Sequence, residues 1–375
     1  MSTTIDLTEE QAMLLDQAAN FARDEAPVSG LRARIAADDD GGLWRQMIEL
    51  GWPGILVPAE HGGVGLGLAE AAPVIEMLGR NLAPSPLFAT LLASHAIATS
   101  ASAAQQADWL PRIAAGAIAT LALTEDDGAW DMSRISATAE RDGDTLALSG
   151  DKCFVLDADR AEIVIASVKL GGATGLVALD GVAVRSKLVR ESVIDETQRS
   201  FRLPLDGIEV AASNLLPKAD LAAIERAALL FSCAEMSGGL AGVLNVTVDY
   251  LKTREQFGKL IGSYQALKHP AVEVLIGLER ARSFLYHAAT MIAEGRMDKA
   301  DIALRMGKAQ GSEAFAFAGD RAVQFHGGFG FTYDCDAQLY LRRALWRQYL
   351  YGDERYHRQL LAPMLLDGAQ NGAVS

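Results

Sequence analysis

The sequence has few cysteines, no excess of positive charge and no long uninterrupted apolar run. Its three cysteines, Cys153, Cys233 and Cys335, have neither the spacing of a metal site nor the even number of a disulfide framework. A formal net charge of −14 argues against nucleic acid or an anionic membrane as a partner. Apolar runs such as Ala227 to Phe231 fall far short of a membrane-spanning helix. The N-terminus shows no signal peptide, so we expect a cytoplasmic protein. From the cysteines, the charge and the apolar runs, we also expect that it binds no metal, no nucleic acid and no membrane.

The chain has 375 residues, half of them hydrophobic, which is enough for a sizeable core. Hydrophobic periodicity predicts an α+β fold with three parts: an N-terminal helical domain (residues 1–118), a middle small antiparallel β domain (119–215) and a C-terminal four-helix bundle (216–375). The middle part is predicted from short β-rich runs separated by turn residues. These runs are Ala119–Leu123, Leu146–Ser149, Glu162–Ala166, Leu176–Leu179, Val182–Val184 and Phe201–Pro204.

One polar pattern in the last part stands out from the rest of the chain. Arg254-Glu255-Gln256-Phe257-Gly258 is followed by Gln265 and then by the stretch from Gln324 to Phe331, which contains Gly327 and Gly328. An arginine offers a planar, permanently charged fork for a pyrophosphate, and glutamine both donates to and accepts from amide-like groups. The pattern therefore indicates a dinucleotide site, against the alternatives of a helix-terminal salt bridge and an ordinary glycine turn.

The same motifs, taken in order, resemble the acyl-CoA dehydrogenase family over nearly the whole chain. The resembling segments are Leu50-Gly51-Trp52 with Val57 to Gly63, the Gly79–Pro86 element, and the pattern RxxFG…Q…QxxGGxGF of the C-terminal part. The resemblance implies a C-terminal bundle that oligomerises and holds the FAD of a neighbouring subunit. It assigns this role to Arg254, Gln256, Phe257, Gln265, Gln324, Gly327 and Gly328. It also implies an acyl-CoA substrate and an electron-transfer flavoprotein as acceptor.

The family's flavin-ring segments are altered in this chain. The TExxxGSD segment corresponds to Thr124–Asp131, in which Thr124, Glu125 and Asp131 fit while Trp130 replaces a small hydroxyl residue. The W-I-T segment corresponds to Phe154-Val155-Leu156. Leu156 has no group to donate the hydrogen bond that the family's threonine directs at the flavin. We therefore expect a weakened ring pocket.

Both positions at which the family carries its catalytic base lack a carboxylate. Tyr351 occupies the position of the glutamate in the YEGT-like turn, and Ala228 occupies the alternative position counted back from Arg254. Tyrosine, with an ordinary pKa of about 10, is a poor proton acceptor at neutral pH. The catalytic residue is therefore unknown, with Glu225, one helical turn before Ala228, as a weak candidate.

Three other carboxylates have ordinary structural interpretations. Glu235, among small and apolar neighbours, is predicted to be buried and paired. Asp353 and Glu354 lie in a charge-rich tract and are predicted to form a solvated face.

These observations support three hypotheses. The pattern QAxKH…QxHGGxGFT…LYLRRA resembles the branch whose members often form α2β2 heterotetramers, including those acting on steroid side-chain CoA esters. The preferred hypothesis is that this chain is the partner subunit that lacks its own base and takes part in FAD-dependent α,β-dehydrogenation of an acyl-CoA thioester. The alternatives are a complete homotetrameric dehydrogenase with Glu225 as a relocated base, and a CoA-ester-binding homologue that is not an enzyme.

Overall fold

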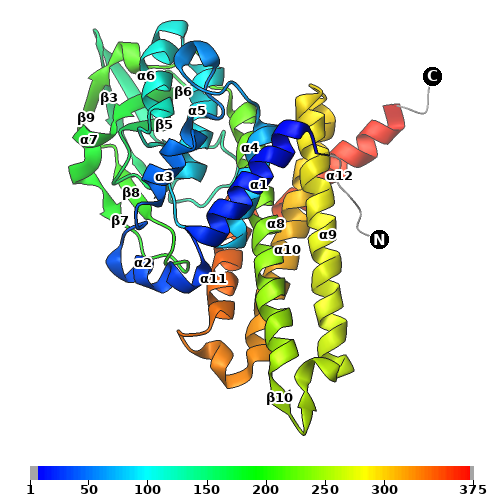
Figure 1. Ribbon diagram of the computed structural model, residues 1–375. Coiled ribbons are helices and arrows are strands. Elements are labelled where there is room, and N and C mark those ends of the chain that lie inside the picture. The colour runs from blue at the N-terminus through cyan, green and yellow to red at the C-terminus, as the bar shows by residue number, and fades with distance from the viewer. Residues whose placement is uncertain (1–6, 372–375) are drawn as a thin grey trace. The chain divides into compact units, whose positions relative to one another are not determined.

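The structure, a computed structural model, describes residues 7–371 and is predominantly helical (Figure 1). Residues 1–6, on which the expectation of no signal peptide partly rests, lie outside the described residues. The α-helices are α1 (Glu9–Asp24), α2 (Leu31–Ala37), α3 (Leu43–Glu49), α4 (Leu68–Arg80), α5 (Leu87–Ser100), α6 (Ala103–Ala114), α7 (Gly181–Val184), α8 (Leu221–Thr253), α9 (Gln265–Ala293), α10 (Met297–His326), α11 (Asp336–Tyr349) and α12 (Glu354–Asn371).

The strands form two sheets in the middle of the sequence and a hairpin near its C-terminal third. They are β1 (Ala119–Ala122), β2 (Thr138–Asp142), β3 (Thr145–Ser149), β4 (Asp151–Leu156), β5 (Ile163–Leu170), β6 (Ala173–Asp180), β7 (Val189–Arg190), β8 (Ser200–Pro204), β9 (Ile208–Ala211), β10 (Glu255–Gln256) and β11 (Lys259–Leu260). The larger sheet has the order β1-β5-β2-β3-β9, with β6 also paired to β5, and the smaller has the order β4-β8-β7. Strands β10 and β11 pair only with each other.

The predicted order of helical, β and helical parts is confirmed, with differences in detail. Residues Val182–Val184, predicted as a strand, belong to helix α7, because the Asp180 side chain accepts hydrogen bonds from the backbone N–H groups of Val182 and Ala183 and so caps a helix. The larger sheet is mixed, since β5 lies parallel to both β1 and β2. Strand β2 was missed because only one of its residues is buried, which leaves no hydrophobic alternation.

The chain divides into two compact units that are discontinuous in sequence. The first comprises Met1–Ala37, Leu68–Ala83 and Ala228–Ser375, and the second comprises Asp38–Gly67 and Pro84–Ala227. The three-part division at residues 118 and 215 therefore stays a prediction.

Glycines on α8 let the helices of the first unit approach closely. A methyl group on Gly238 would lie 1.8 Å from the carbonyl oxygen of Glu76 on α4, and one on Gly239 would lie 2.2 Å from the Phe315 ring on α10. A larger residue at Gly238 would push the α8 and α4 backbones apart, and one at Gly239 would displace the Phe315 ring. Helices α8, α9 and α10 consequently run side by side along this unit (Figure 1).

Helix α8 is long and apolar enough to cross a membrane by length and composition alone. Its uninterrupted apolar runs are nevertheless short, because α8 mixes apolar residues with small ones such as Gly238 and Ser232. Of its most apolar part, 89% is buried inside the protein, as in the core helix of a globular fold.

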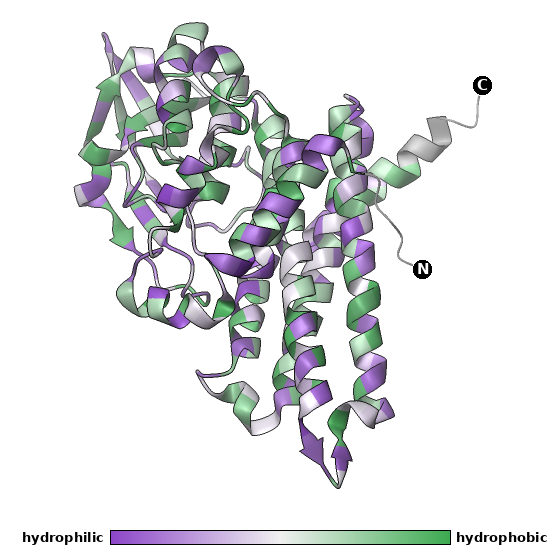
Figure 2. Cartoon of the chain, viewed as in Figure 1, coloured by the Kyte–Doolittle hydropathy of each residue, from purple (hydrophilic) through white to green (hydrophobic). Residues whose placement is uncertain are grey.

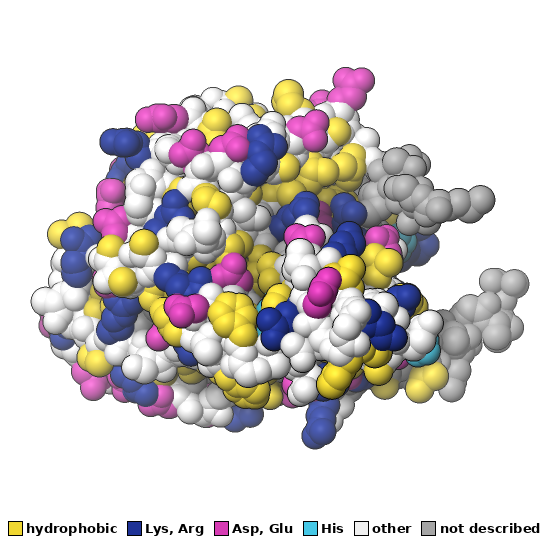
Figure 3. Space-filling view, turned by 60° about the horizontal axis from the view of Figure 1, so that its bottom comes forward, with side chains coloured by type: hydrophobic (Ala, Val, Ile, Leu, Met, Phe, Trp, Pro, Cys, Tyr) yellow, Lys and Arg dark blue, Asp and Glu magenta, His cyan; other side chains and the backbone are white. Residues whose placement is uncertain are grey.

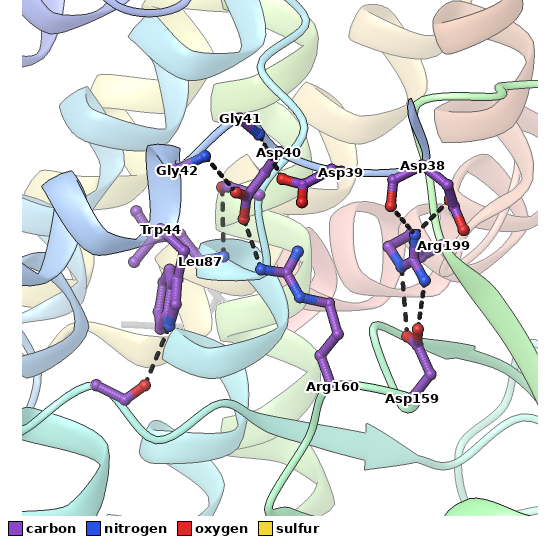
Figure 4. A network of polar contacts seen from close by, with 12 residues as sticks. Asp38, Asp39, Asp40, Gly41, Gly42, Trp44, Leu87, Asp159, Arg160 and Arg199 are labelled. Atoms are coloured by element: carbon purple, nitrogen blue, oxygen red, sulfur yellow. Dashed lines mark hydrogen bonds and ion pairs between the residues drawn. The ribbon is translucent and has the colours of Figure 1, made fainter. Parts of the chain in front are cut away.

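A network of ion pairs holds the turn after β4 in the second unit (Figure 4). Arg199 pairs with Asp38 and Asp159, and Arg160 pairs with Asp40 across 2.6 Å. The acidic segment that precedes α3 is thereby fixed to the loop between β4 and β5. This loop directly follows Leu156, which the sequence predicts to belong to a flavin-ring segment.

Candidate functional site

Helix α8 ends in a tight hairpin that carries two of the predicted site residues. Phe257 and Gly258 form the two-residue loop between β10 and β11, with φ values of +56° and +76°. Positive φ at both loop positions is the geometry that matches the twist of paired strands, and glycine adopts it without strain. Phe257 adopts it despite its bulk, and its side chain is 91% exposed. Figure 2 shows β10 as a strongly hydrophilic strand, consistent with Glu255 and Gln256.

A cavity of about 800 Å³ lies beside this hairpin, within the first unit. The core beneath it is formed by Leu251, Ile261 and Phe325. The cavity is lined by Tyr250, Arg254, Gln256, Phe257, Ile261, Tyr264, Ala266, Leu267, Phe325, His326, Gly327, Gly328 and Phe329. Figure 3, which turns the hairpin end of the molecule forward, shows hydrophobic side chains next to Lys and Arg side chains.

The structure therefore brings together most of the residues predicted for the dinucleotide site. Arg254, Gln256, Phe257, Gly327 and Gly328 all line the cavity. The other two predicted residues do not line it. Gln265 begins α9 next to the lining residues Tyr264 and Ala266, and Gln324 precedes the lining residue Phe325.

The long polar side chains at this site are not used by the chain itself. Arg254, Gln256, Gln265 and Gln324 are all exposed. Within residues 7–371, none of these four side chains makes an ion pair or a hydrogen bond, so Arg254 has no carboxylate partner there. A guanidinium and amides that face solvent together are available for a ligand with phosphate and amide groups.

Aromatic rings form the wall of the cavity. The ring of Tyr250 stacks on that of His326, with centroids 4.0 Å apart and planes inclined by 24°. The Tyr264 hydroxyl donates to the backbone carbonyl of Gln256 at 3.2 Å, and the Lys259 ammonium lies 4.3 Å from the Tyr264 ring centroid. Flat aromatic faces beside a guanidinium fit a heteroaromatic base joined to a pyrophosphate. The residues present thus fit a dinucleotide.

Two glycines after α10 keep the backbone accessible at the cavity. Gly327 has φ +60° and ψ −139°, a conformation that favours glycine. A methyl group on Gly328 would meet no other atom within 4 Å, so the backbone here lies open. Gly330 has a different role, since a methyl group there would lie 2.2 Å from the carbonyl oxygen of Val323.

The residues that match the flavin-ring segments lie in the second unit, where Glu125 is part of the internal packing. Its carboxylate lies 2.6 Å from the Lys152 ammonium and accepts backbone hydrogen bonds from Ser136 and Ala137. Burial opposes ionisation of Glu125, but the hydrogen bonds from Lys152, Ser136 and Ala137 lower its pKa to about 2. Glu125 therefore holds the Thr124–Asp131 loop in place and is not available as a base.

In the segment Phe154-Val155-Leu156, the aromatic side chain of Phe154 is exposed and the aliphatic side chain of Leu156 is buried. Phe154 lies in a β-bulge with φ +54° and is 41% exposed, and its backbone N–H donates to Glu191 at 2.9 Å. Leu156 is buried, and its side chain has no donor to offer. Trp130 is half-buried and Asp131 accepts hydrogen bonds from Ser133.

The two positions predicted for a catalytic base carry no carboxylate, and the first of them is closed. Ala228 is fully buried on α8, and Leu229 beside it is buried as well. Tyr351 follows α11 with φ +62°, and burial raises its pKa to about 12. A tyrosine with this pKa keeps its proton at neutral pH and so is not a proton acceptor.

A buried lysine fixes the turn that carries Tyr351. The Lys308 ammonium donates to the backbone carbonyls of Arg347, Gln348 and Gly352 at 3.0, 3.0 and 2.6 Å. Burial lowers the pKa of Lys308 to about 7. This role could not be predicted, because nothing in the local pattern distinguishes Lys308 from an exposed helix lysine.

The alternative carboxylates have separate roles. Glu235 is buried and forms ion pairs with Arg343 and Arg347, which confirms the prediction for this residue. Asp353 accepts a hydrogen bond from the Tyr356 backbone N–H at 2.8 Å, as an N-cap of α12. Glu354 accepts one from Gln348 at 3.0 Å. Both are half-buried, so the expectation of a solvated face was wrong for them.

Glu225 is half-buried in the first turns of α8 and takes part in interactions within the chain. Sequence reasoning also missed the contribution of Tyr250 and did not assign one to His326. A usable signal was present for the tyrosine, since Tyr250 lies four residues, about one helical turn, before Arg254, whose backbone N–H donates to the Tyr250 carbonyl at 2.9 Å.

Comparison with known proteins matches this arrangement to one family. Residues 222–366 match the model of the acyl-CoA dehydrogenase C-terminal domain, and residues 8–117 match that of its N-terminal domain. The chain is 32% identical over 340 residues to acyl-CoA dehydrogenase IpdE2 of Mycobacterium tuberculosis, which covers 90% of this chain and 91% of that protein. It is 27% identical over 380 residues to acryloyl-CoA reductase (NADH) of Anaerotignum propionicum, covering 95% and 94%.

Solved structures agree with these sequence relatives. A variant of the Tcur3481-Tcur3483 steroid ACAD superimposes with a TM-score of 0.87 at 29% identity, covering 96% of this chain and 99% of that one. The chain belongs to the acyl-CoA dehydrogenase family, a family of oxidoreductases with FAD as cofactor.

Proposed function

We propose that this chain is the partner subunit of a heterotetrameric acyl-CoA dehydrogenase. In this role its cavity beside the β10–β11 hairpin holds the adenosine-diphosphate part of an FAD whose ring and catalytic base belong to another polypeptide. The observation that carries the proposal is an asymmetry within the chain. The polar side chains at the cavity are exposed and available, whereas both base positions, Ala228 and Tyr351, lack a carboxylate.

Each residue predicted for the dinucleotide site, whether it lines the cavity or lies next to a lining residue, has a role that its chemistry suits. Arg254 would neutralise and orient the pyrophosphate, and the Gly327-Gly328 backbone would let the phosphates approach closely. Gln256, Gln265 and Gln324 would hydrogen-bond the remaining polar groups of the nucleotide. FAD, when bound, would accept the hydride released from the β-carbon of the acyl group.

The absence of a usable base limits what this chain does by itself. Removal of the α-proton needs a group that is ionised near neutral pH and lies within reach of the substrate. Glu125 is bound to Lys152, Glu235 is bound to two arginines, and Tyr351 keeps its proton. On this proposal the base and the flavin ring are supplied by a homologous subunit in an α2β2 assembly.

The relatives support the nature of the substrate and the assembly. The steroid ACAD structure at 29% identity carries a paired name, Tcur3481-Tcur3483, in keeping with two unlike chains. We therefore propose an acyl-CoA substrate with a steroid-derived or similar acyl group. An electron-transfer flavoprotein is proposed as the electron acceptor, and a cytoplasmic location stays a prediction.

The test is flavin stoichiometry of the full chain purified alone and after co-expression with its nearest homologous gene. We expect a colourless protein alone, and a yellow complex with about one flavin for every two chains when the partner is present. One flavin per chain with dehydrogenase turnover and no partner would contradict the proposal. That outcome would favour the homotetramer with Glu225 as base, and a colourless protein under both conditions would favour a CoA-ester-binding protein that is not an enzyme.

A further inference from the structure

We propose that a second cavity of the first unit binds an aliphatic carboxylate, which places its charge on the Arg80 guanidinium and its hydrocarbon tail against an apolar wall. This cavity has a volume of about 490 Å³. It is lined by Ala19, Ala22, Arg23, Pro27, Val28, Met77, Arg80, Asn81, Gly242, Asn245, Val246 and Tyr340, all of which belong to the first unit. The inference goes beyond the proposed function, because this cavity shares no lining residue with the one beside the β10–β11 hairpin.

Contacts between four helices fix the shape of this second cavity. The Tyr340 hydroxyl of α11 donates to the backbone carbonyl of Arg80 at the end of α4, across 2.7 Å. The Asn81 side chain donates to the Ala22 carbonyl of α1 at 2.6 Å. A methyl group on Gly242 of α8 would lie 2.2 Å from the Arg80 carbonyl oxygen, so glycine is needed for this close approach. The walls are therefore set by the fold.

Arg80 brings to the cavity a positive charge that the chain does not neutralise. Its side chain is half-buried, and within the described residues its guanidinium makes no ion pair or hydrogen bond. The other lining arginine, Arg23, is already paired with Asp24 at 2.7 Å. No carboxylate side chain lines the cavity in the part of the chain that the structure describes. A partly buried guanidinium in this position favours an anion, since a charge-assisted hydrogen bond is stronger than a neutral one.

The remaining polar groups of the cavity suit an anion better than a cation. The carbonyl oxygens of Ala22 and Arg80 already accept hydrogen bonds within the chain, and a metal ion such as Mg²⁺ would need oxygen ligands. Asn245 is exposed, and its amide makes no hydrogen bond within residues 7–371. Its N–H groups can donate to one carboxylate oxygen while Arg80 binds the other.

The rest of the wall is apolar, which distinguishes an aliphatic carboxylate from a bare phosphate. The apolar lining residues, which are buried or half-buried, are Ala19, Ala22, Pro27, Val28, Met77 and Val246. Each methylene group of a ligand that leaves water for such a wall strengthens binding roughly fourfold. A phosphate would leave the wall in contact with water, so the combination of one free cation and an apolar wall favours an amphiphilic anion.

The experiment compares octanoate, its neutral analogue octanamide and inorganic phosphate by isothermal titration calorimetry on the full chain. We expect the wild-type chain to bind octanoate about tenfold more tightly than octanamide, and more tightly than phosphate. Arg80→Met keeps the length of the side chain but removes its charge, so the ratio of octanoate to octanamide affinity should fall to about one. The control Arg280→Met changes an exposed arginine of α9 outside the cavity and should keep the wild-type ratio.

Three results would overturn this inference. Octanoate affinity that is the same in Arg80→Met and in the wild type would show that the carboxylate binds elsewhere or not at all. Equal binding of octanoate and octanamide to the wild type would remove the role of the charge, and phosphate bound as tightly as octanoate would remove the role of the apolar wall. If Arg80→Met does not fold, Val246→Phe gives a second test, because a larger side chain on the apolar wall should weaken octanoate binding about tenfold. Unchanged octanoate binding in Val246→Phe would then contradict the site.

Discussion

The end of the helical bundle that carries Arg254 differs from the end of α11 that carries Tyr351 in how polar groups are used. The side chains of Arg254, Gln256, Gln265 and Gln324 reach solvent and, in the described part of the chain, make no ion pair or hydrogen bond. Near Tyr351, two ionisable side chains are buried and bound to the chain: Glu235 to two arginines, and Lys308 to three backbone carbonyls. The first region has the chemistry of a binding surface and the second that of a core.

A ligand site and a structural network can contain the same types of residue, such as arginine with glutamine or arginine with glutamate. They differ in whether those side chains already have partners within the chain. A structural network is closed, since each charge has its partner within the chain, and removing one member leaves another uncompensated. A ligand site is open until its ligand arrives. Predictions that remove one member from each region test the contrast directly.

The largest effect is expected in the closed network. Glu235→Ala leaves Arg343 and Arg347 buried without their carboxylate and should lower the free energy of unfolding by about 3–5 kcal/mol. The matched control is Glu313→Ala, which breaks an exposed pair with Arg358 and should cost about 1 kcal/mol or less. Urea denaturation of the full chain measures both. Unchanged stability together with lost turnover in the assembled enzyme would instead make Glu235 a catalytic residue.

The open site should respond to a charge deletion in the opposite manner. Arg254→Met should weaken ADP binding roughly 10- to 100-fold, because a charge-assisted contact to phosphate is lost, while stability stays near that of the wild type. Arg280→Met, at an exposed position of α9 outside the cavity, is the control and should leave ADP affinity unchanged. Titration calorimetry and denaturation on the same samples give both quantities. A large loss of stability in Arg254→Met would show that Arg254 belongs to a structural network and not to an open ligand site.

The buried side chain of Lys308 should make the stability of the closed network depend on pH. Burial lowers its folded-state pKa from 10.5 to about 7, so between these values the unfolded chain binds a proton that the folded chain does not. Stability should therefore rise as the pH increases from about 7 towards 10, by at most about 1.4 kcal/mol per pH unit. Lys308→Met should remove this rise, whereas Lys268→Met, on the exposed side of α9, should keep it. Identical pH profiles for Lys308→Met and the wild type would show that Lys308 stays protonated in the fold.

The sequence predicted the order of helical and β parts, and it predicted a group of site residues of which Arg254, Gln256, Phe257, Gly327 and Gly328 line one cavity. Hydrophobic periodicity reports which faces of helices are buried, and the Arg254 and Gln324 motifs have fixed spacings along the chain. The stack of Tyr250 on His326 and the capping of the Tyr351 turn by Lys308 join residues that are distant in the sequence. Such pairings depend on how helices pack against each other, which one sequence does not reveal. The burial and pairing of Glu235 could be predicted because the small and apolar residues next to it in the sequence indicated burial.

The smallest effect is expected at Glu225, and it bears most directly on the division of labour between subunits. This carboxylate is half-buried in the first turns of α8, where the helix dipole favours a negative charge by about 0.3 kcal/mol. Glu225→Gln keeps the size and the hydrogen-bonding capacity of the side chain, so flavin content and turnover of the co-expressed complex should stay within about twofold of the wild type. Turnover under substrate saturation and flavin absorbance check both at once. Abolished turnover with full flavin content would show that Glu225 is the catalytic base and lies in this chain. The start of α8 would then be a third region, distinct from the open binding surface and the closed core, that carries the chemistry.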